Sequence, residues 1–113
     1  MKVIIPENRL EQIIFKYLDV KFKDLEQSKG GSHDIIFKIP GEEYGVLGWE
    51  KTGFLFIYGK IIDNIESFIP IKYPETNNII GRYVEDRYNL KVRFTPSYAH
   101  HKQMFRWDRY NIN

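Results

Sequence analysis

The stretch that decides the fold is residues 35–58, IIFKIPGEEYGVLGWEKTGFLFIY. It contains three apolar runs, at 35–39, 44–49 and 54–58, that are rich in the β-branched and aromatic residues typical of strands. Pro40-Gly41 follows the first run, and Glu50-Lys51-Thr52-Gly53 separates the last two. Because short connections of this kind join neighbouring antiparallel strands, residues 35–58 predict a three-stranded meander.

Helices are predicted on both sides of the meander. From Glu7 an apolar stripe recurs at helical spacing and continues to about Glu26, and a loop is expected over 27–32. After the meander, a short helix is expected from about Lys60 to Phe68. A long helix should begin near Pro74 and end near Asn89, a residue that suits a helix C-terminus.

Two further strands are expected near the ends of the chain. Val3-Ile4-Ile5 is a short apolar strand or lead-in, and Leu90–Thr95 alternates apolar with polar side chains. The predicted order is therefore (β)αβββ(α)αβ. It indicates an α+β fold with an antiparallel sheet of three to five strands and two main helices packed on one face. The residues expected to be most buried are Leu10, Ile13, Ile14, Leu18, Ile36, Leu55, Ile57, Ile80 and Val84.

Length and composition favour a single domain over residues 1–113, because a chain of this size has no room for a second core. The chain contains no cysteine, which excludes disulfides and thiolate chemistry. Residues 1–6 are too short and too soon interrupted for a signal peptide, and no apolar run approaches the ~18 residues that cross a bilayer. We therefore expect a cytoplasmic protein with no membrane partner.

Charge is divided unevenly along the chain. The basic aromatic C-terminal segment, residues 87–113, has six Lys or Arg residues and one acid, for a net charge of +5, whereas residues 1–86 sum to −3. The same segment carries six aromatic residues and two of the three histidines. Cations that attract phosphate, combined with rings that stack on bases, are typical of surfaces that bind nucleic acid.

The sequence therefore predicts a non-enzymatic binding protein whose C-terminal surface engages nucleic acid or an acidic protein. The sequence does not distinguish these two kinds of partner, because an acidic protein presents the same charge as a nucleic acid. Alternation of residues 105–110 is equally compatible with a closing strand whose rings complete the core. The predicted binding residues are Lys91, Arg93, Lys102, Arg106, Trp107, Arg109 and Tyr110.

Two segments of the chain carry a resemblance to a protein family. The first, residues 3–10 (VIIPENRL) followed by residues 13–19 (IIFKYLD), and the second, residues 80–92 (IGRYVEDRYNLKV), are similar to small uncharacterised accessory proteins of tailed marine bacteriophages. The resemblance covers about a quarter of the chain and implies no activity. It implies a viral context, in which the cytoplasm would be that of the host cell.

Other functions have weaker support in the sequence. His100 or His101 beside Lys102 could serve a metal-independent ribonuclease, because imidazole transfers protons and a lysine steadies an anion. A minor virion component is a third alternative, in which an edge strand at 91–95 pairs with its copy in a homodimer. His33-Asp34 lacks the further ligands of a metal site, and no phosphate-binding glycine loop is present. We therefore predict no catalytic residues, no metal and no cofactor.

Overall fold

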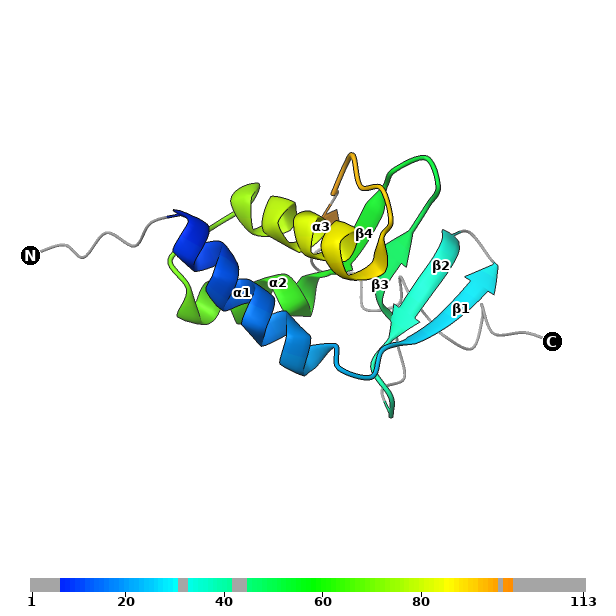
Figure 1. Cartoon of the computed structure of the whole chain (residues 1–113), viewed down its shortest axis with the longest axis horizontal. Coiled ribbons are helices and arrows are strands. Elements are labelled where there is room, and N and C mark those ends of the chain that lie inside the picture. Colours follow the sequence, from blue (N-terminus) through cyan, green and yellow to red (C-terminus); the bar gives the residue numbers. More distant parts are fainter. Residues whose placement is uncertain (1–6, 31–32, 42–44, 96, 99–113) are drawn as a thin grey trace, which may run out of the picture.

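The computed structural model describes residues 7–30, 33–41, 45–95 and 97–98 of the 113-residue chain (Figure 1). The predicted strand at residues 3–5 lies outside them. The elements in chain order are α1 (Glu7–Lys21), β1 (Glu26–Gly30), β2 (His33–Lys38), β3 (Gly45–Trp49), β4 (Leu55–Tyr58), α2 (Gly59–Phe68), α3 (Glu75–Tyr88) and β5 (Ser97–Tyr98).

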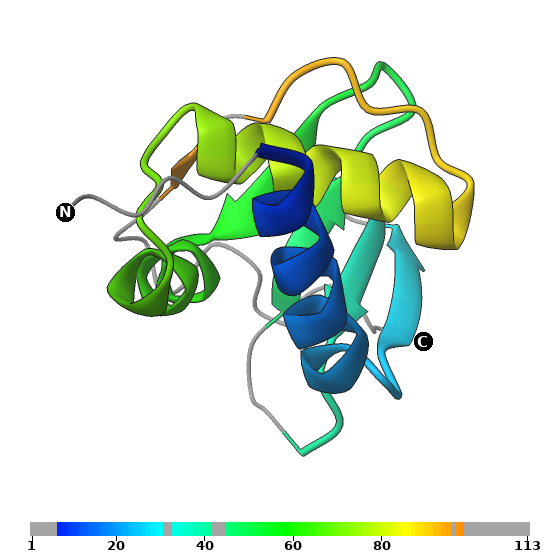
Figure 2. The ribbon, with the colours of Figure 1, turned by 60° about the vertical axis from the view of Figure 1, so that its left-hand side comes forward.

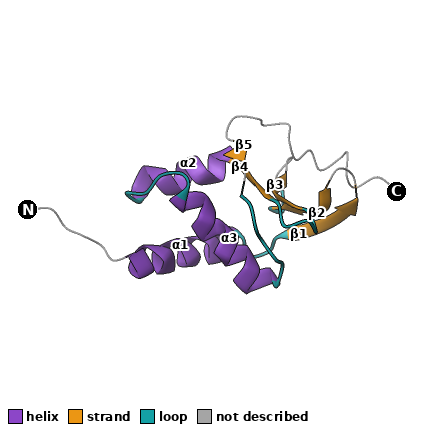
Figure 3. Cartoon of the chain, turned by 90° about the horizontal axis from the view of Figure 1, so that it is seen from above, coloured by secondary structure: helices purple, strands orange, loops and turns teal. Residues whose placement is uncertain are grey.

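The strands form one sheet in the order β1-β2-β3-β4-β5. The first four pair antiparallel as a meander, and β5 pairs parallel to β4. In Figure 3 the helices lie to one side of the sheet. The predicted α+β class and the meander of residues 35–58 are therefore confirmed.

The end of α1 and the start of the sheet differ from the prediction. The helix ends at Lys21 rather than near Glu26, and Glu26–Gly30 is a strand where a loop was predicted. Phe22 still donates its N–H to the Leu18 carbonyl at 2.7 Å, and its side chain is buried. The polar residues of β1 gave no strand signal, because this edge strand is held through backbone pairing with β2.

Figure 2 shows helices in front of the sheet, and the residues of the main core come from both. Phe37, Leu47 and Ile57 are in register across β2, β3 and β4 and are fully buried. Eight of the nine residues predicted to be most buried are buried. The prediction for Ile13 is wrong, because its side chain is 37% exposed. The buried face of α1 follows Leu10, Ile14 and Leu18, four residues apart, and leaves Ile13 on its flank.

The opposite face of the sheet is also buried at its centre. Ile36, Gly48 and Phe56 are paired across β2, β3 and β4, one position away from the main core register. All three are buried. The meander therefore excludes water from both faces, which explains why its strands are almost continuously apolar.

Ion pairs and hydrogen bonds join α1 to α3. Arg82 contacts Glu11 at 2.6 Å, and the Nε of Arg87 contacts Asp19 at 2.9 Å. The buried Tyr83 donates its hydroxyl to Asp19 at 2.9 Å. No helix within the described residues is long and apolar enough to span a membrane.

Candidate functional site

Only two of the seven predicted binding residues are described. Lys91 and Arg93 are both exposed, and they lie close together in the chain just after α3. The other predicted residues lie outside the described part of the chain, as do the two histidines of the ribonuclease alternative. They are Lys102, Arg106, Trp107, Arg109, Tyr110, His100 and His101.

Residues 90–95, which we call the strap, connect α3 with the sheet. The prediction that they form a strand is wrong: only Phe94 makes an isolated bridge, to Phe54. The strap begins after Asn89, whose φ of 56° ends α3 in a left-handed cap. Within the described residues, the strap pairs with the edge of β4 only at Phe94, whose carbonyl accepts the Leu55 N–H at 2.9 Å, and the residues before Phe94 have other partners.

Those partners come from the β3–β4 turn and from α3. Arg93 and Phe94 both donate their N–H groups to the Gly53 carbonyl, at 2.7 and 3.1 Å. Val92 donates its N–H to the Glu85 carboxylate at 2.9 Å, and the Lys91 carbonyl accepts from the Trp49 indole at 3.0 Å. These bonds fix the strap from two sides.

Two glycines allow the strap to lie this close. Gly53 has a φ of +106°, and a Cβ there would stand 2.8 Å from the Cγ of Arg93. Gly81 faces the strap from α3, where a Cβ would meet Thr95 Cγ2 at 3.0 Å and Val92 Cγ1 at 3.2 Å. A Cβ at Gly53 would force Arg93 to shift, whereas one at Gly81 would need the methyl groups of Thr95 and Val92 to give way by a few tenths of an ångström.

The strap forms one wall of an open cavity that we call the aromatic groove. Its volume is about 370 Å³. Phe94 is 57% exposed and stacks on Phe54 with ring centroids 5.0 Å apart, and Tyr73 is 64% exposed. Exposed rings that gather around one cavity are a feature of binding sites, whereas singly exposed rings are common. The groove is lined by Phe54, Tyr73, Pro74, Asn78, Arg93, Phe94 and Thr95.

The charge near the groove is positive. Arg93 lines it, Lys72 and Glu75 are next to lining residues in the chain, and the exposed Lys91 is two positions before Arg93. Among the described residues no acid forms an ion pair with these three cations, whereas Arg82 and Arg87 are each paired with a carboxylate. Arg93 is therefore available to an external anion.

The perturbed ionisable groups lie elsewhere, between α1 and α3. Hydrogen bonds from Arg87 and Tyr83 lower the pKa of Asp19, against the opposing effect of burial. Burial and the hydrogen bond to Asp19 raise the pKa of Tyr83 above its usual value. These groups satisfy one another and line no described cavity, so their shifts reflect a structural link between the helices.

Sequence reasoning counted Phe94 among the aromatic residues of the C-terminal segment but did not predict it as a binding residue, and it missed Phe54 and Tyr73. Tyr73 lies in the segment between α2 and α3, and Phe54 and Phe94 occupy positions that the pattern assigned to strands. The available signal was an aromatic residue directly before Pro74 in the linker between the two helices. Within the described ranges, no three His, Asp or Glu side chains gather in a way that could hold a metal ion.

The chain matches no protein-family model, no curated protein and no solved structure.

Proposed function

We propose that this protein binds single-stranded nucleic acid in the aromatic groove. The observation that carries the proposal is the pair of exposed rings, Phe94 and Tyr73, beside an arginine with no acidic partner among the described residues. Proteins that bind single strands combine aromatic platforms for the bases with cations that follow the backbone. Phe94 and Tyr73 provide the platform, and Arg93 and Lys91 contact phosphates.

A single strand fits this site better than a duplex. Bases in a duplex are stacked on one another, so their faces are closed to side chains, whereas a single strand can place an unstacked base on a ring. Phe54 stacks on one face of the Phe94 ring, and the backbone N–H groups of Arg93 and Phe94 bond to the Gly53 carbonyl. A rigid platform of this kind loses little entropy when a base stacks on it.

The cations and rings near the C-terminus are proposed to contribute to the same binding. Lys102, Arg106 and Arg109 add positive charge, and Trp107 and Tyr110 add rings. The phage context and the host cytoplasm likewise remain predictions from the sequence.

The stacking role is tested with Phe94→Ala and a fluorescently labelled oligothymidine. Loss of one stacked base should weaken binding by about 1–3 kcal/mol, or roughly 5- to 150-fold in Kd. The matched control is Phe68→Ala, because Phe68 is 51% exposed on α2 and lines no described cavity. Its affinity should equal that of the unmodified protein.

The phosphate role is tested by the salt dependence of the same binding. Each neutralised phosphate on a single strand contributes a slope of about −0.7 in log K against log salt. Arg93→Gln should reduce the magnitude of the slope by about that amount. If the oligonucleotide does not bind while polyglutamate binds in an Arg93-dependent way, the partner is an acidic protein and the nucleic-acid proposal fails.

A further inference from the structure

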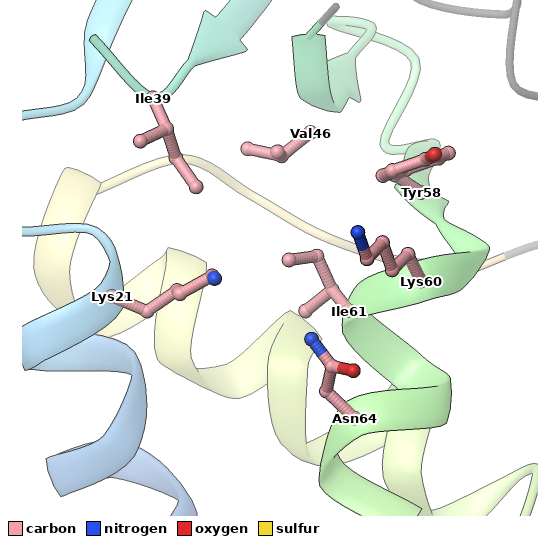
Figure 4. Close-up of a pocket in the computed structure, with 7 residues that line it drawn as sticks. All are labelled: Lys21, Ile39, Val46, Tyr58, Lys60, Ile61 and Asn64. Carbon is pink, nitrogen blue, oxygen red and sulfur yellow. The ribbon is translucent and has the colours of Figure 1, made fainter. Parts of the chain in front are cut away.

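A second cavity lies where α1, α2 and the β2–β3 end of the sheet meet (Figure 4). It is an open pocket of about 100 Å³, which we call the lysine pocket. This volume is below the roughly 300–1,000 Å³ of sites for drug-sized ligands, so the pocket suits only a small ligand that also extends over its open rim. The lining residues are Lys21, Ile39, Val46, Tyr58, Lys60, Ile61 and Asn64.

The pocket has an apolar floor and a nitrogen-rich rim. Ile39, Val46 and Ile61 supply the aliphatic surface, and the last two are buried. In Figure 4 the ammonium groups of Lys21 and Lys60 point toward the space between the elements from opposite sides. The amide nitrogen of Asn64 is turned toward the same space. A chemically divided pocket of this kind selects a ligand with an apolar body and a charged head.

The charges around the pocket favour a ligand whose head group is negative. Both lysines are exposed, and among the described residues neither forms an ion pair with an acid. The first turn of α2 contains no acidic residue, and its N-cap, Tyr58, makes no side-chain capping bond. The partial positive charge of this helix end therefore adds to the charge of the two ammonium groups.

We propose that the lysine pocket binds a small amphipathic organic anion. Its carboxylate or phosphate head lies between Lys21 and Lys60 and accepts a hydrogen bond from Asn64. Its short aliphatic or aromatic body rests on Ile61 and Val46. The pocket shares no lining residue with the aromatic groove, so this proposal is independent of nucleic-acid binding.

The probes are hexanoate and hexyl phosphate, with hexanol and hexylammonium as matched controls of the same apolar length. Backbone amide shifts of residues 58–64 are followed by NMR during each titration. Both the apolar floor and the positive rim are needed, so at least one anion should saturate at millimolar concentration while the alcohol and the amine do not. The better of the two anions identifies the head group as carboxylate or phosphate.

Variants assign the binding to the two lysines. Lys21→Gln and Lys60→Gln should each weaken the anion roughly 3- to 10-fold, because each removes one charge-assisted hydrogen bond at an open site. Lys16→Gln is the control, since Lys16 is an exposed lysine of α1 that does not line the pocket. Circular dichroism confirms that all three variants fold.

Three results would overturn the proposal. The first is failure of both anions to saturate. The second is hexylammonium binding as tightly as the anions. The third is an equal affinity in Lys60→Gln, Lys21→Gln and Lys16→Gln.

Discussion

Replacing Gly53 with alanine should detach the strap from the β3–β4 turn. Gly53 has a φ of +106°, where an L-residue costs about 1–2 kcal/mol. Its new Cβ would also stand 2.8 Å from Arg93 Cγ and 3.0 Å from Arg93 Cβ. These atoms lie next to the backbone, so the strap itself must move and weaken the two bonds to the Gly53 carbonyl. The steric clash and the weakened bonds together add about 1–2 kcal/mol.

The chain supplies a matched control for this variant. Gly41 has a φ of +87°, but a Cβ there meets nothing within 4 Å. Gly41→Ala therefore carries only the backbone cost of about 1–2 kcal/mol. Gly53→Ala should lower the free energy of unfolding by about 2–4 kcal/mol in total, a large part of the stability of a small domain.

The assay is urea unfolding of both variants, together with oligothymidine affinity. Gly53→Ala should be less stable than Gly41→Ala by at least about 1 kcal/mol, and it alone should lose affinity. The reasoning is refuted if the two variants are equally destabilised, since the contact with Arg93 would then have no energetic consequence. Unchanged affinity in Gly53→Ala would show that the position of the strap does not determine binding.

Two further predictions concern the links around α3. Asp19→Asn should lower the free energy of unfolding by about 1 kcal/mol near neutral pH, because it weakens the bonds with Arg87 and Tyr83 on a partly exposed site. The pKa of Asp19 is lowered from about 3.8 on folding, so this stabilisation is present above that value and is lost as the pH falls below it. Urea titrations of both proteins should converge at low pH, and a constant difference would contradict the shift. Trp49→Phe should lower the free energy of unfolding by about 0.5–1.5 kcal/mol, because the Lys91 carbonyl loses its indole donor. An unchanged urea midpoint would show that this hydrogen bond does not stabilise the fold.

Elements with a strong apolar period were predictable from the sequence. The meander of residues 35–58 and the helices at 59–68 and 75–88 follow directly from spacing, and Asn89 caps α3 where its residue type indicated. Burial of Leu10, Ile14 and Leu18 follows from the same period. These features are local, because the side chains that define the pattern also form the contact surface.

Features that depend on partners distant in the chain were not predictable. β1 is a polar strand that forms because its backbone pairs with the edge of β2. The strap alternates like a strand, yet its partners are the carbonyl of Gly53 and side chains of β3 and α3, which the sequence does not bring together. The same holds for the aromatic groove, since Tyr73 and Phe94 are 21 positions apart. Of the predicted binding residues, Lys91 and Arg93 lie at or near this groove, and the positions of the others remain predictions.

Photo-crosslinking tests the central claim most directly. A single strand carrying 5-bromouracil is irradiated in complex with the protein, and the modified residues are identified by mass spectrometry. Because the bases are proposed to stack in the aromatic groove, the account predicts adducts on Phe94 and Tyr73 that an excess of unlabelled strand abolishes. Adducts confined to other peptides, those of residues 99–113 included, would contradict the claim that the groove is the binding site.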